Sequence, residues 1–445
     1  MSKTKSSNNK LAINMLIAMI AGIAAGLVFM AIRESLGADS STWQTINKWL
    51  FQDISAEGAN KAIGLFYIGG QLFIRSFQLI IVPMVFSSIV IAFSEIKEAS
   101  LLGRVSAKTI GWFLITSFTA LILAGIVGLI CFNAGLFNVA VEGLEGASGS
   151  TGSNPLMVIL NIIPSNIGAT FSVNNAVLAV VFLAVVCGLC MHKSNSEDST
   201  ILKICREISD IVVVFLNFVV NKFGPVCIFM LLSRTFATYG ISYLKPALAY
   251  VILCFVMLLL FLFVGYPVIL AIATHMNPII YIKKIMKVVV FGFSTSSSAA
   301  TLPLNLDTNI EELGVDKQIA SFVLPLGMTI NMDGTAIMQV IAALFIAGCG
   351  GYQVSIPTLI MIMLLALIAS AGTPAAPGAG AVILFTILSG VGFTNDPALV
   401  AYALILSINR PIEMLVTALN CVGDSVAAIA VAKSEGKLDE NIYNK

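Results

Sequence analysis

The segment Asn331-Met332-Asp333-Gly334-Thr335 interrupts a long apolar stretch, residues 316–349, near its middle. Asn, Asp, Gly and Thr are weak helix formers, so we expect the helix to unwind there. Unwinding frees backbone carbonyl oxygens, which together with the carboxylate of Asp333 would form a cage suited to a hard monovalent cation. Asp333 could instead be a buried structural acceptor, but a carboxylate in such apolar surroundings is costly, which favours a functional role.

A second polar set lies on the last long apolar segment of the chain. At about 100° per residue, Arg410, Glu413, Thr417, Asn420 and Asp424 fall on one side of a helix over about four turns. Arg410 and Glu413 are spaced i,i+3 and could simply neutralise each other. That pairing does not account for the Asn and the Asp farther along, so this face is predicted to line a cavity or a binding site.

Two further segments place small and polar residues between apolar arms. Segment 278–312 carries Ser294-Thr295-Ser296-Ser297-Ser298, and segment 355–392 carries the Gly-, Ala- and Pro-rich run 371–380. Each arm has about a dozen residues, too few to cross a bilayer, which predicts two re-entrant hairpins. The alternative is a pair of kinked helices with a Ser-rich packing face. Two such segments flanking a broken helix favour a binding site at membrane depth.

The composition requires lipid as the solvent for most of the chain. Of its 445 residues, 58% are hydrophobic and 11% are charged, whereas a soluble protein has about 25% charged residues. A membrane-spanning helix needs about 20 apolar residues. Eight segments are interpreted as spanning helices: 11–32, 65–94, 106–138, 177–191, 205–237, 244–273, 316–349 and 398–432.

Lys and Arg residues concentrate in alternate connections, which predicts the orientation of these helices. The N-terminal tail, the connection 97–108, the stretch after residue 191 and the segment 283–287 are basic, whereas 137–155 has no Lys or Arg. By the positive-inside rule, both termini are expected in the cytoplasm.

Other classes of function have little support. A net charge of +1 gives no general attraction to nucleic acid. The sequence has no P-loop signature, and its two His residues, His192 and His275, lie near predicted membrane boundaries, so neither an ATP-driven pump nor an enzyme is expected. A passive channel would need a continuous polar path rather than one enclosed site. The eight Cys residues lie mostly in apolar runs and are interpreted as small hydrophobes.

Four motifs, in order, resemble those of one known family, the dicarboxylate/amino acid:cation symporters, or glutamate transporter family. They are Ser296-Ser297-Ser298 with Thr301-Leu302-Pro303, Asn331-Met332-Asp333-Gly334-Thr335, Pro377-Gly378-Ala379-Gly380, and Asn420 with Gly423-Asp424. The resemblance extends over essentially the whole chain and suggests a bacterial member of the neutral amino acid type. It implies an all-α polytopic membrane protein with eight transmembrane helices and two re-entrant helical hairpins. It also implies a homotrimer in the cell inner membrane that works by an elevator mechanism.

The family's plan implies a static scaffold and a mobile transport domain. The expected parts are a cytoplasmic N-terminal tail (1–10), scaffold helices 1–2 (11–94), helix 3 of the transport domain (95–138), scaffold helices 4–5 with helix 6 (139–273), re-entrant hairpin 1 (278–312), broken helix 7 (316–349), re-entrant hairpin 2 as the gate (355–392), helix 8 (398–432) and a cytoplasmic C-terminal tail (433–445).

Carried over by position, the resemblance implies three sodium sites and no other cofactor. One is held by the carboxylate of Asp424 with main-chain oxygens of Gly327, Asn331 and Asn420. A second uses carbonyl oxygens of Thr329, Met332, Ser370, Ala371 and Thr373. A third uses groups of Thr116, Ser117, Asn331 and Asp333, where Phe113 stands in place of a usual Tyr.

The resemblance also implies where an amino acid binds. The α-carboxylate would meet Asn420 and the tip of hairpin 1, and the ammonium group would meet Glu413. The implied substrate residues are Ser296, Ser297, Ser298, Thr335, Ala376, Gly380, Glu413, Val416, Thr417 and Asn420. Glu413 replaces the family's usual Asp, and Ala376 replaces a usual Val. Members with acidic substrates carry an Arg one residue before Thr417, whereas this chain has Val416.

Val416 bears directly on the expected substrate. An Arg side chain forks onto a carboxylate and Val cannot replace it, so the resemblance predicts sodium-coupled uptake of a neutral amino acid such as serine, alanine or threonine. Arg410, however, is a spare cation that could pair with Glu413 or reach an acidic ligand from a different side. The alternative is therefore a sodium- or proton-coupled symporter of an acidic amino acid or dicarboxylate, or of a larger amino acid such as cystine or an aromatic one.

Overall fold

The computed structural model describes residues 2–55, 59–94, 100–139, 163–172, 176–193, 199–371, 373 and 378–445. These residues are nearly all helical, as predicted, with one isolated β-bridge between Val315 and Leu438. The α-helices are α1 (Ser2–Leu36), α2 (Ser41–Leu50), α3 (Leu65–Ser94), α4 (Ser100–Asn133), α6 (Ile167–Ser172), α7 (Val177–Lys193), α8 (Thr200–Phe218), α9 (Gly224–Tyr239), α10 (Leu244–Leu260), α11 (Tyr266–Thr274), α12 (Pro278–Thr295), α13 (Ser298–Asp307), α14 (Lys317–Ile330), α15 (Asp333–Cys349), α16 (Ile356–Ala371), α17 (Ala379–Val391), α18 (Asp396–Ile408), α19 (Arg410–Ser434) and α20 (Glu440–Asn444).

Six helical stretches among the described residues are long and apolar enough to cross a membrane. They are Ile17–Leu36, Leu65–Ile91, Arg104–Asn133, Gly224–Thr274, Lys317–Cys349 and Arg410–Ser434. The fourth covers parts of two predicted spanning helices, because the 3₁₀ turn Gly240–Tyr243 joins α9 to α10 without a gap. Six stretches therefore stand where eight spanning helices were predicted, and the count of eight stays a prediction.

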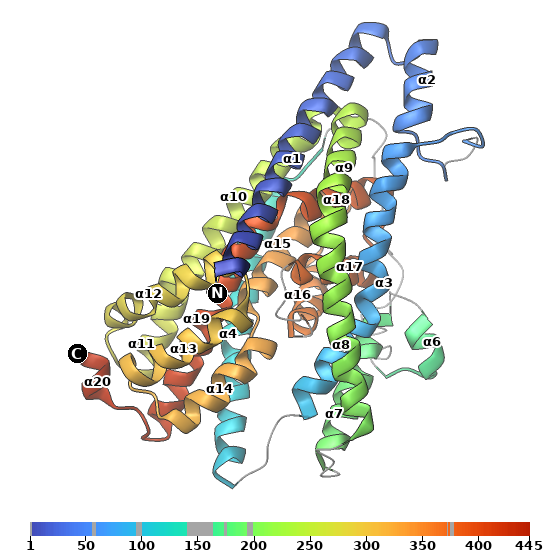
Figure 1. Ribbon diagram of the computed structural model, residues 1–445. Coiled ribbons are helices and arrows are strands. Elements are labelled where there is room, and N and C mark those ends of the chain that lie inside the picture. Colours follow the sequence, from blue (N-terminus) through green and yellow to red (C-terminus); the bar gives the residue numbers. More distant parts are fainter. Residues whose placement is uncertain are drawn as a thin grey trace.

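The centre of the molecule is formed by α15 and α19 (Figure 1). All 17 residues of α15 are buried. This helix packs against α4, α10, α16 and α19, and α19 in turn packs against α12, α14 and α11. The segments that carry the predicted chemistry therefore lie inside the bundle.

An outer wall is formed by α1, α3, α7, α8 and α9, which pack mainly on one another (Figure 1). Large apolar side chains point away from the protein on these helices: Ile17 and Val28 on α1 are each 59% exposed, and Val214 on α8 is 69% exposed. Apolar side chains exposed in this way along helices long enough to span a bilayer are suited to contact with lipid.

The first predicted hairpin consists of α12, α13 and a final π-helical turn, Thr308–Glu312. The chain reverses at Ser296, whose φ of 49° is in the left-handed region. The prediction of arms of about a dozen residues was wrong here, since α12 alone has 18 residues. The predicted bounds of this hairpin, 278–312, nevertheless coincide with the start of α12 at Pro278 and the end of the π-helical turn at Glu312.

The second predicted hairpin consists of α16 and α17, which pack against each other. These helices have 16 and 13 residues, and α17 begins after Gly378, whose φ is 87°. Much of the tip, residues 372 and 374–377, lies outside the described residues.

The last predicted spanning segment, 398–432, is not one continuous helix. The chain forms α18 and α19, which are separated at Asn409. Pro411 lies in the first turn of α19, where its missing N–H leaves no helical hydrogen bond unmade. The prediction of a single helix was wrong because it gave this proline no weight.

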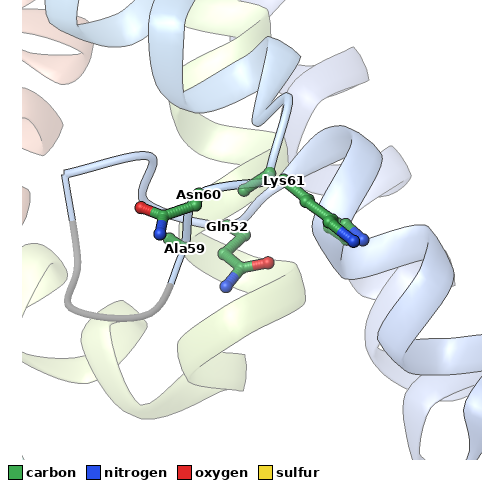
Figure 2. Close-up of a pocket in the computed structure, with 6 residues that line it drawn as sticks. Gln52, Ala59, Asn60 and Lys61 are labelled. Atoms are coloured by element: carbon green, nitrogen blue, oxygen red, sulfur yellow. The ribbon is translucent and has the colours of Figure 1, made fainter.

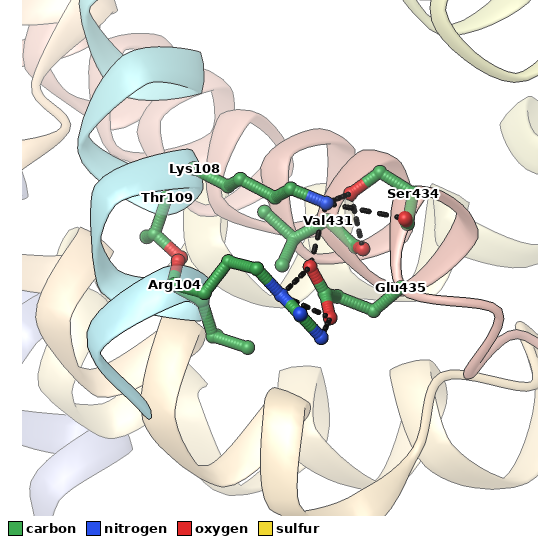
Figure 3. A network of polar contacts seen from close by, with 7 residues as sticks. Arg104, Lys108, Thr109, Val431, Ser434 and Glu435 are labelled. Carbon is green, nitrogen blue, oxygen red and sulfur yellow. Dashed lines mark hydrogen bonds and ion pairs between the residues drawn. The ribbon is translucent and has the colours of Figure 1, made fainter. Parts of the chain in front are cut away.

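The end of α19 is tied to α4 by ion pairs (Figure 3). A carboxylate oxygen of Glu435 lies 2.5 Å from Nη2 of Arg104, and the other lies 2.5 Å from Nζ of Lys108. Lys108 also donates to the carbonyl and hydroxyl oxygens of Ser434, each at 3.1 Å. The hydrogen bonds from Arg104 and Lys108 lower the pKa of Glu435 to about 2.

Candidate functional site

The helix formed by α14 and α15 is interrupted at Asn331 and Met332, where unwinding is expected from the sequence. Their backbone angles are non-helical, with ψ of 83° and 50°. The N–H of Asn331 donates to the carbonyl of Gly327 and ends α14. Asp333 then begins α15, where its carboxylate is favoured by the partial positive charge of a helix N-terminus.

The carboxylate of Asp333 is fully buried and receives two hydroxyl hydrogen bonds. Ser117 of α4 donates to its Oδ1, and Tyr266 of α11 donates to its Oδ2 at 2.9 Å. Two elements far apart in sequence therefore position this carboxylate beside the break in the helix.

Asn331 links the first and third predicted cation sets. Its Oδ1 accepts a hydrogen bond from Thr116 Oγ1 at 3.3 Å, and its Nδ2 donates to Oδ1 of Asp424 at 3.1 Å. Ser117, the neighbour of Thr116 on α4, donates to Asp333, so the four members of the third predicted set form two hydrogen-bonded pairs side by side.

Gly327 allows Asp424 to approach the backbone of α14. A Cβ atom at Gly327 would lie 2.7 Å from Cγ of Asp424 and 3.1 Å from Cζ of Phe113. Any side chain there would displace the carboxyl group. Gly423 is crowded in the same way, since its Cβ would lie 2.9 Å from Nδ2 of Asn331.

The two buried carboxylates thus lie in two hydrogen-bonded groups, which meet at the neighbouring residues Thr116 and Ser117. Together we call them the carboxylate cluster: Thr116, Ser117, Tyr266, Asn331, Asp333 and Asp424. Within the described part of the chain, no Lys or Arg forms an ion pair with Asp333 or Asp424. Buried negative charge without a cationic partner is costly. Carboxylate, amide and hydroxyl oxygens around a broken helix fit a hard cation such as sodium.

The second predicted cation set is not joined by hydrogen bonds in the described residues. Thr329 Oγ1 donates to the carbonyl of Leu326, while Ser370 Oγ donates to that of Leu367. The carbonyl of Met332 accepts from Ala336. Ala371 and Thr373 complete the set at the end of α16, which packs on α14, and Gly372 between them is outside the described residues.

Asn420 holds the start of α15 against α19. Its Oδ1 accepts from the backbone N–H of Gly334 at 2.8 Å, and its Nδ2 lies 3.2 Å from Oγ1 of Thr335. A Cβ at Gly334 would lie 3.2 Å from Cα of Val416, so the two helices approach closely there. Val416 itself is 6% exposed and belongs to the apolar core.

The tip of the first hairpin lies beside α19. Ser297 begins α13 by accepting a hydrogen bond from the N–H of Ala300, and Ser298 is buried. Gly292 of α12 approaches α19 so closely that a Cβ there would lie 3.2 Å from Cα of Ala418. Ser296 ends α12 at the reversal.

Glu413 of α19 is only 9% exposed. It accepts hydrogen bonds from Nδ2 of Asn409, at 3.4 Å, and from the backbone of Gly378. Nη1 of Arg410 lies 3.5 Å from its Oε2. The hydroxyl of Thr417 donates to the Glu413 carbonyl rather than into a cavity.

Gly380 of α17 contacts α15. Its carbonyl accepts from Nε2 of Gln339 at 3.0 Å, and a Cβ on it would lie 3.1 Å from Cγ2 of Thr335 and 3.2 Å from Cε of Met338. The predicted substrate residue Ala376 lies outside the described residues.

Three residues at this site were missed by the sequence prediction. Tyr266 supports Asp333, Tyr250 donates to Oδ1 of Asn409 at 2.7 Å, and Oε1 of Gln339 is buried with no hydrogen-bond partner among the described residues. The two tyrosines lie in apolar runs, so nothing in their local sequence marks them. Gln339 is a polar residue within an apolar segment and could have been found by that signal.

A separate cavity of about 400 Å³ lies near α2 (Figure 2). It is lined by Lys48, Gln52, Ala59, Asn60, Lys61 and Ala62. None of the predicted site residues lines it.

Comparison with known proteins agrees with the motifs. The sodium:dicarboxylate symporter family matches residues 11–434, which confirms the family inferred from the sequence. The chain is 30% identical to a proton/sodium-glutamate symport protein of Bacillus caldotenax, over 83% of this chain and 88% of the relative. It is 29% identical to a proton/glutamate-aspartate symporter of Escherichia coli (strain K12), over 96% of this chain and 94% of the relative. The chain therefore belongs to the sodium:dicarboxylate symporter family.

Proposed function

We propose that this protein is a secondary active symporter that couples cation flux to the uptake of an acidic amino acid such as glutamate or aspartate. The observation that carries the proposal is the carboxylate cluster, in which Asp333 and Asp424 are buried without a basic partner among the described residues. A transported cation would neutralise this charge when the site is loaded.

Coupling follows if ligand and cation bind to connected groups. Asn331 contacts Asp424, and the backbone three residues later, at Gly334, is held by Asn420, the residue implied to meet the α-carboxylate. A cation that orders the break between α14 and α15 would thereby order Asn420. Each ligand would then raise the affinity for the other by the same factor.

The substrate class is supported by the relatives rather than by Val416. The two relatives described above are named for glutamate, and one of them also for aspartate. They favour the acidic alternative over the neutral amino acid predicted from Val416. Sodium and protons both appear in these names, so both are retained as coupling ions.

We also propose the family's elevator arrangement and a trimeric assembly in the plasma membrane, with both termini in the cytoplasm. Support for a separate transport domain comes from the packing: α12, α13, α14 and α15 pack on α19, whereas α1, α3, α7, α8 and α9 pack largely on one another. The second hairpin, α16 and α17, would be the gate, since its Gly378 reaches Glu413.

Ligand-induced thermal stabilisation of the purified protein tests this function. Glutamate, aspartate, their amides, serine, alanine and cystine are each added in sodium and in choline buffer, at pH 7 and at pH 5. We expect glutamate or aspartate to raise the melting temperature, and to do so only with sodium or at the lower pH. Stabilisation by serine or alanine but not by the acidic pair would restore the neutral prediction. Equal stabilisation in all buffers would contradict cation coupling.

A further inference from the structure

The guanidinium group of Arg410 is buried at the substrate end of α19 with unmade hydrogen bonds. Its side chain is 12% exposed, and its Nε and Nη1 atoms are buried with no hydrogen-bond partner among the described residues. Nη1 lies 3.5 Å from Oε2 of Glu413, which is within ion-pair distance but at the outer limit of a hydrogen bond. The pairing of Arg410 with Glu413 is therefore incomplete.

A buried charged donor without an acceptor is unfavourable. The N–H groups of Nε and Nη1 therefore require an acceptor that the described residues do not supply. A planar guanidinium matches a carboxylate, which can accept two parallel hydrogen bonds from it. An amide or a hydroxyl offers no charge to balance it. An acidic ligand fits this demand better than a neutral one.

The neighbours of Arg410 are the residues implied to hold a substrate. Glu413, one turn along α19, accepts hydrogen bonds from Asn409 and from Gly378 of the second hairpin. Asn409 lies 3.8 Å from the sulfur of Met338, and Met338 packs against Gly380. Arg410 is thus beside Glu413, the predicted ammonium anchor.

Val416 offers no charge at the position where acidic-substrate members carry an Arg. Arg410 precedes it by six residues, which is about 9 Å along the helix axis. At Val416 the backbone of α19 is also approached closely by Gly334 of α15.

We infer that Arg410 binds the side-chain carboxylate of the substrate and so selects acidic amino acids. This inference rests on the proposed function and identifies the residue that recognises the side chain of the substrate. The ammonium group of the ligand pairs with the carboxylate of Glu413. The second carboxylate of the ligand accepts hydrogen bonds from Nε of Arg410 and from Nη2, whose N–H lies parallel to that of Nε. Arg410, at the N-terminal end of α19, supplies the positive charge that acidic-substrate members carry at the position of Val416.

The test measures dissociation constants of glutamate, aspartate, glutamine and asparagine, and of sodium alone, for four proteins. These are the wild type, Arg410→Gln, the double variant Arg410→Gln/Val416→Arg, and Arg104→Gln. Arg104 lies in the surface ion pair with Glu435, so Arg104→Gln is a control for the loss of one positive charge far from the site. Sodium binding without amino acid reports that each variant is folded.

We expect Arg410→Gln to weaken glutamate or aspartate binding by about 100-fold, because charged hydrogen bonds to a carboxylate are lost. Binding of the amides should change by less than about threefold, and sodium binding should not change. The double variant should regain at least a tenfold preference for the acidic ligand, and Arg104→Gln should match the wild type. A variant that keeps the wild-type ratio of glutamate to glutamine affinity would overturn the role of Arg410.

The proposed function and the proposed role of Arg410 are tested by different measurements. If the wild type binds no acidic amino acid under any cation condition, the proposed function is wrong. If the wild type binds glutamate and Arg410→Gln binds it equally well, only the role of Arg410 is wrong. Should Arg410→Gln not fold, Arg410→Lys replaces it. Lys keeps the charge without the fork, so a weakening of about 10-fold supports the inference and no weakening overturns it.

Discussion

Substitution of Gly327 by Ala tests whether Asp424 forms a cation site against α14. The added methyl group would lie 2.7 Å from Cγ of Asp424 and 3.1 Å from Cζ of Phe113. Ordinary carbon–carbon contacts are about 3.5–4.0 Å, so the carboxyl group must retreat by about 1 Å. Its hydrogen bond with Asn331 would be stretched by the same movement.

The loss of cation affinity can be worked out from this displacement. A cation at about 2.4 Å from a carboxylate oxygen loses about 2 kcal/mol of attraction when that distance grows to about 3.4 Å, at an effective dielectric constant of about 20. This corresponds to sodium binding that is about 30-fold weaker. Overpacking also destabilises the fold by about 1–3 kcal/mol.

The assay is a sodium titration of the purified variant, followed by calorimetry or by the melting temperature. Gly111→Ala is the matched control, because a Cβ at this other helical glycine would meet nothing within 4 Å. We expect Gly111→Ala to bind sodium like the wild type and to be equally or more stable, since Ala favours helix. A folded Gly327→Ala protein with wild-type sodium affinity would refute this reasoning.

Three other changes give separate predictions. Ser117→Ala removes one hydrogen bond to the buried carboxylate of Asp333, and should weaken sodium binding by about 10- to 100-fold in the same titration; unchanged binding would remove Ser117 from the site. Asn409→Leu leaves the hydroxyl of Tyr250 without an acceptor, and should lower the free energy of unfolding by about 1–3 kcal/mol, which a denaturant titration in detergent detects. Glu435→Gln should lower the melting temperature at pH 7, and less so in high salt. Because the folded pKa of Glu435 is depressed to about 2, its stabilising effect is fully present above the unfolded value near 4.5 and is lost as the pH falls toward 2. A difference in melting temperature between Glu435→Gln and the wild type that does not shrink as the pH falls toward 2 would contradict this origin.

The predictable parts of the site depend on local sequence. The break at Asn331 and Met332 was predictable because four weak helix formers stand together in an apolar stretch. The division at Asn409 could also have been predicted, since Pro411 favours the first turn of a new helix. Both features are encoded within a few neighbouring residues.

The partners of these residues were not predictable in the same way. Tyr266 meets Asp333 across 67 positions, and Tyr250 meets Asn409 across 159. Each of these tyrosines lies among apolar residues, and its hydroxyl acquires a partner only when distant helices pack. From the sequence, Arg410 could either pair with Glu413 or bind an acidic ligand. Only the structure shows that its pairing with Glu413 is incomplete.

Uptake into proteoliposomes tests the central claim of cation-coupled transport most directly. Radiolabelled glutamate is supplied outside, with an inward sodium gradient, an inward proton gradient, both, or neither, and with Asp424→Asn as the matched variant. The account predicts accumulation above the outside concentration only when an inward cation gradient is present, and loss of that accumulation in Asp424→Asn. Equilibration to the outside concentration regardless of the gradient, or accumulation that Asp424→Asn preserves, would contradict it.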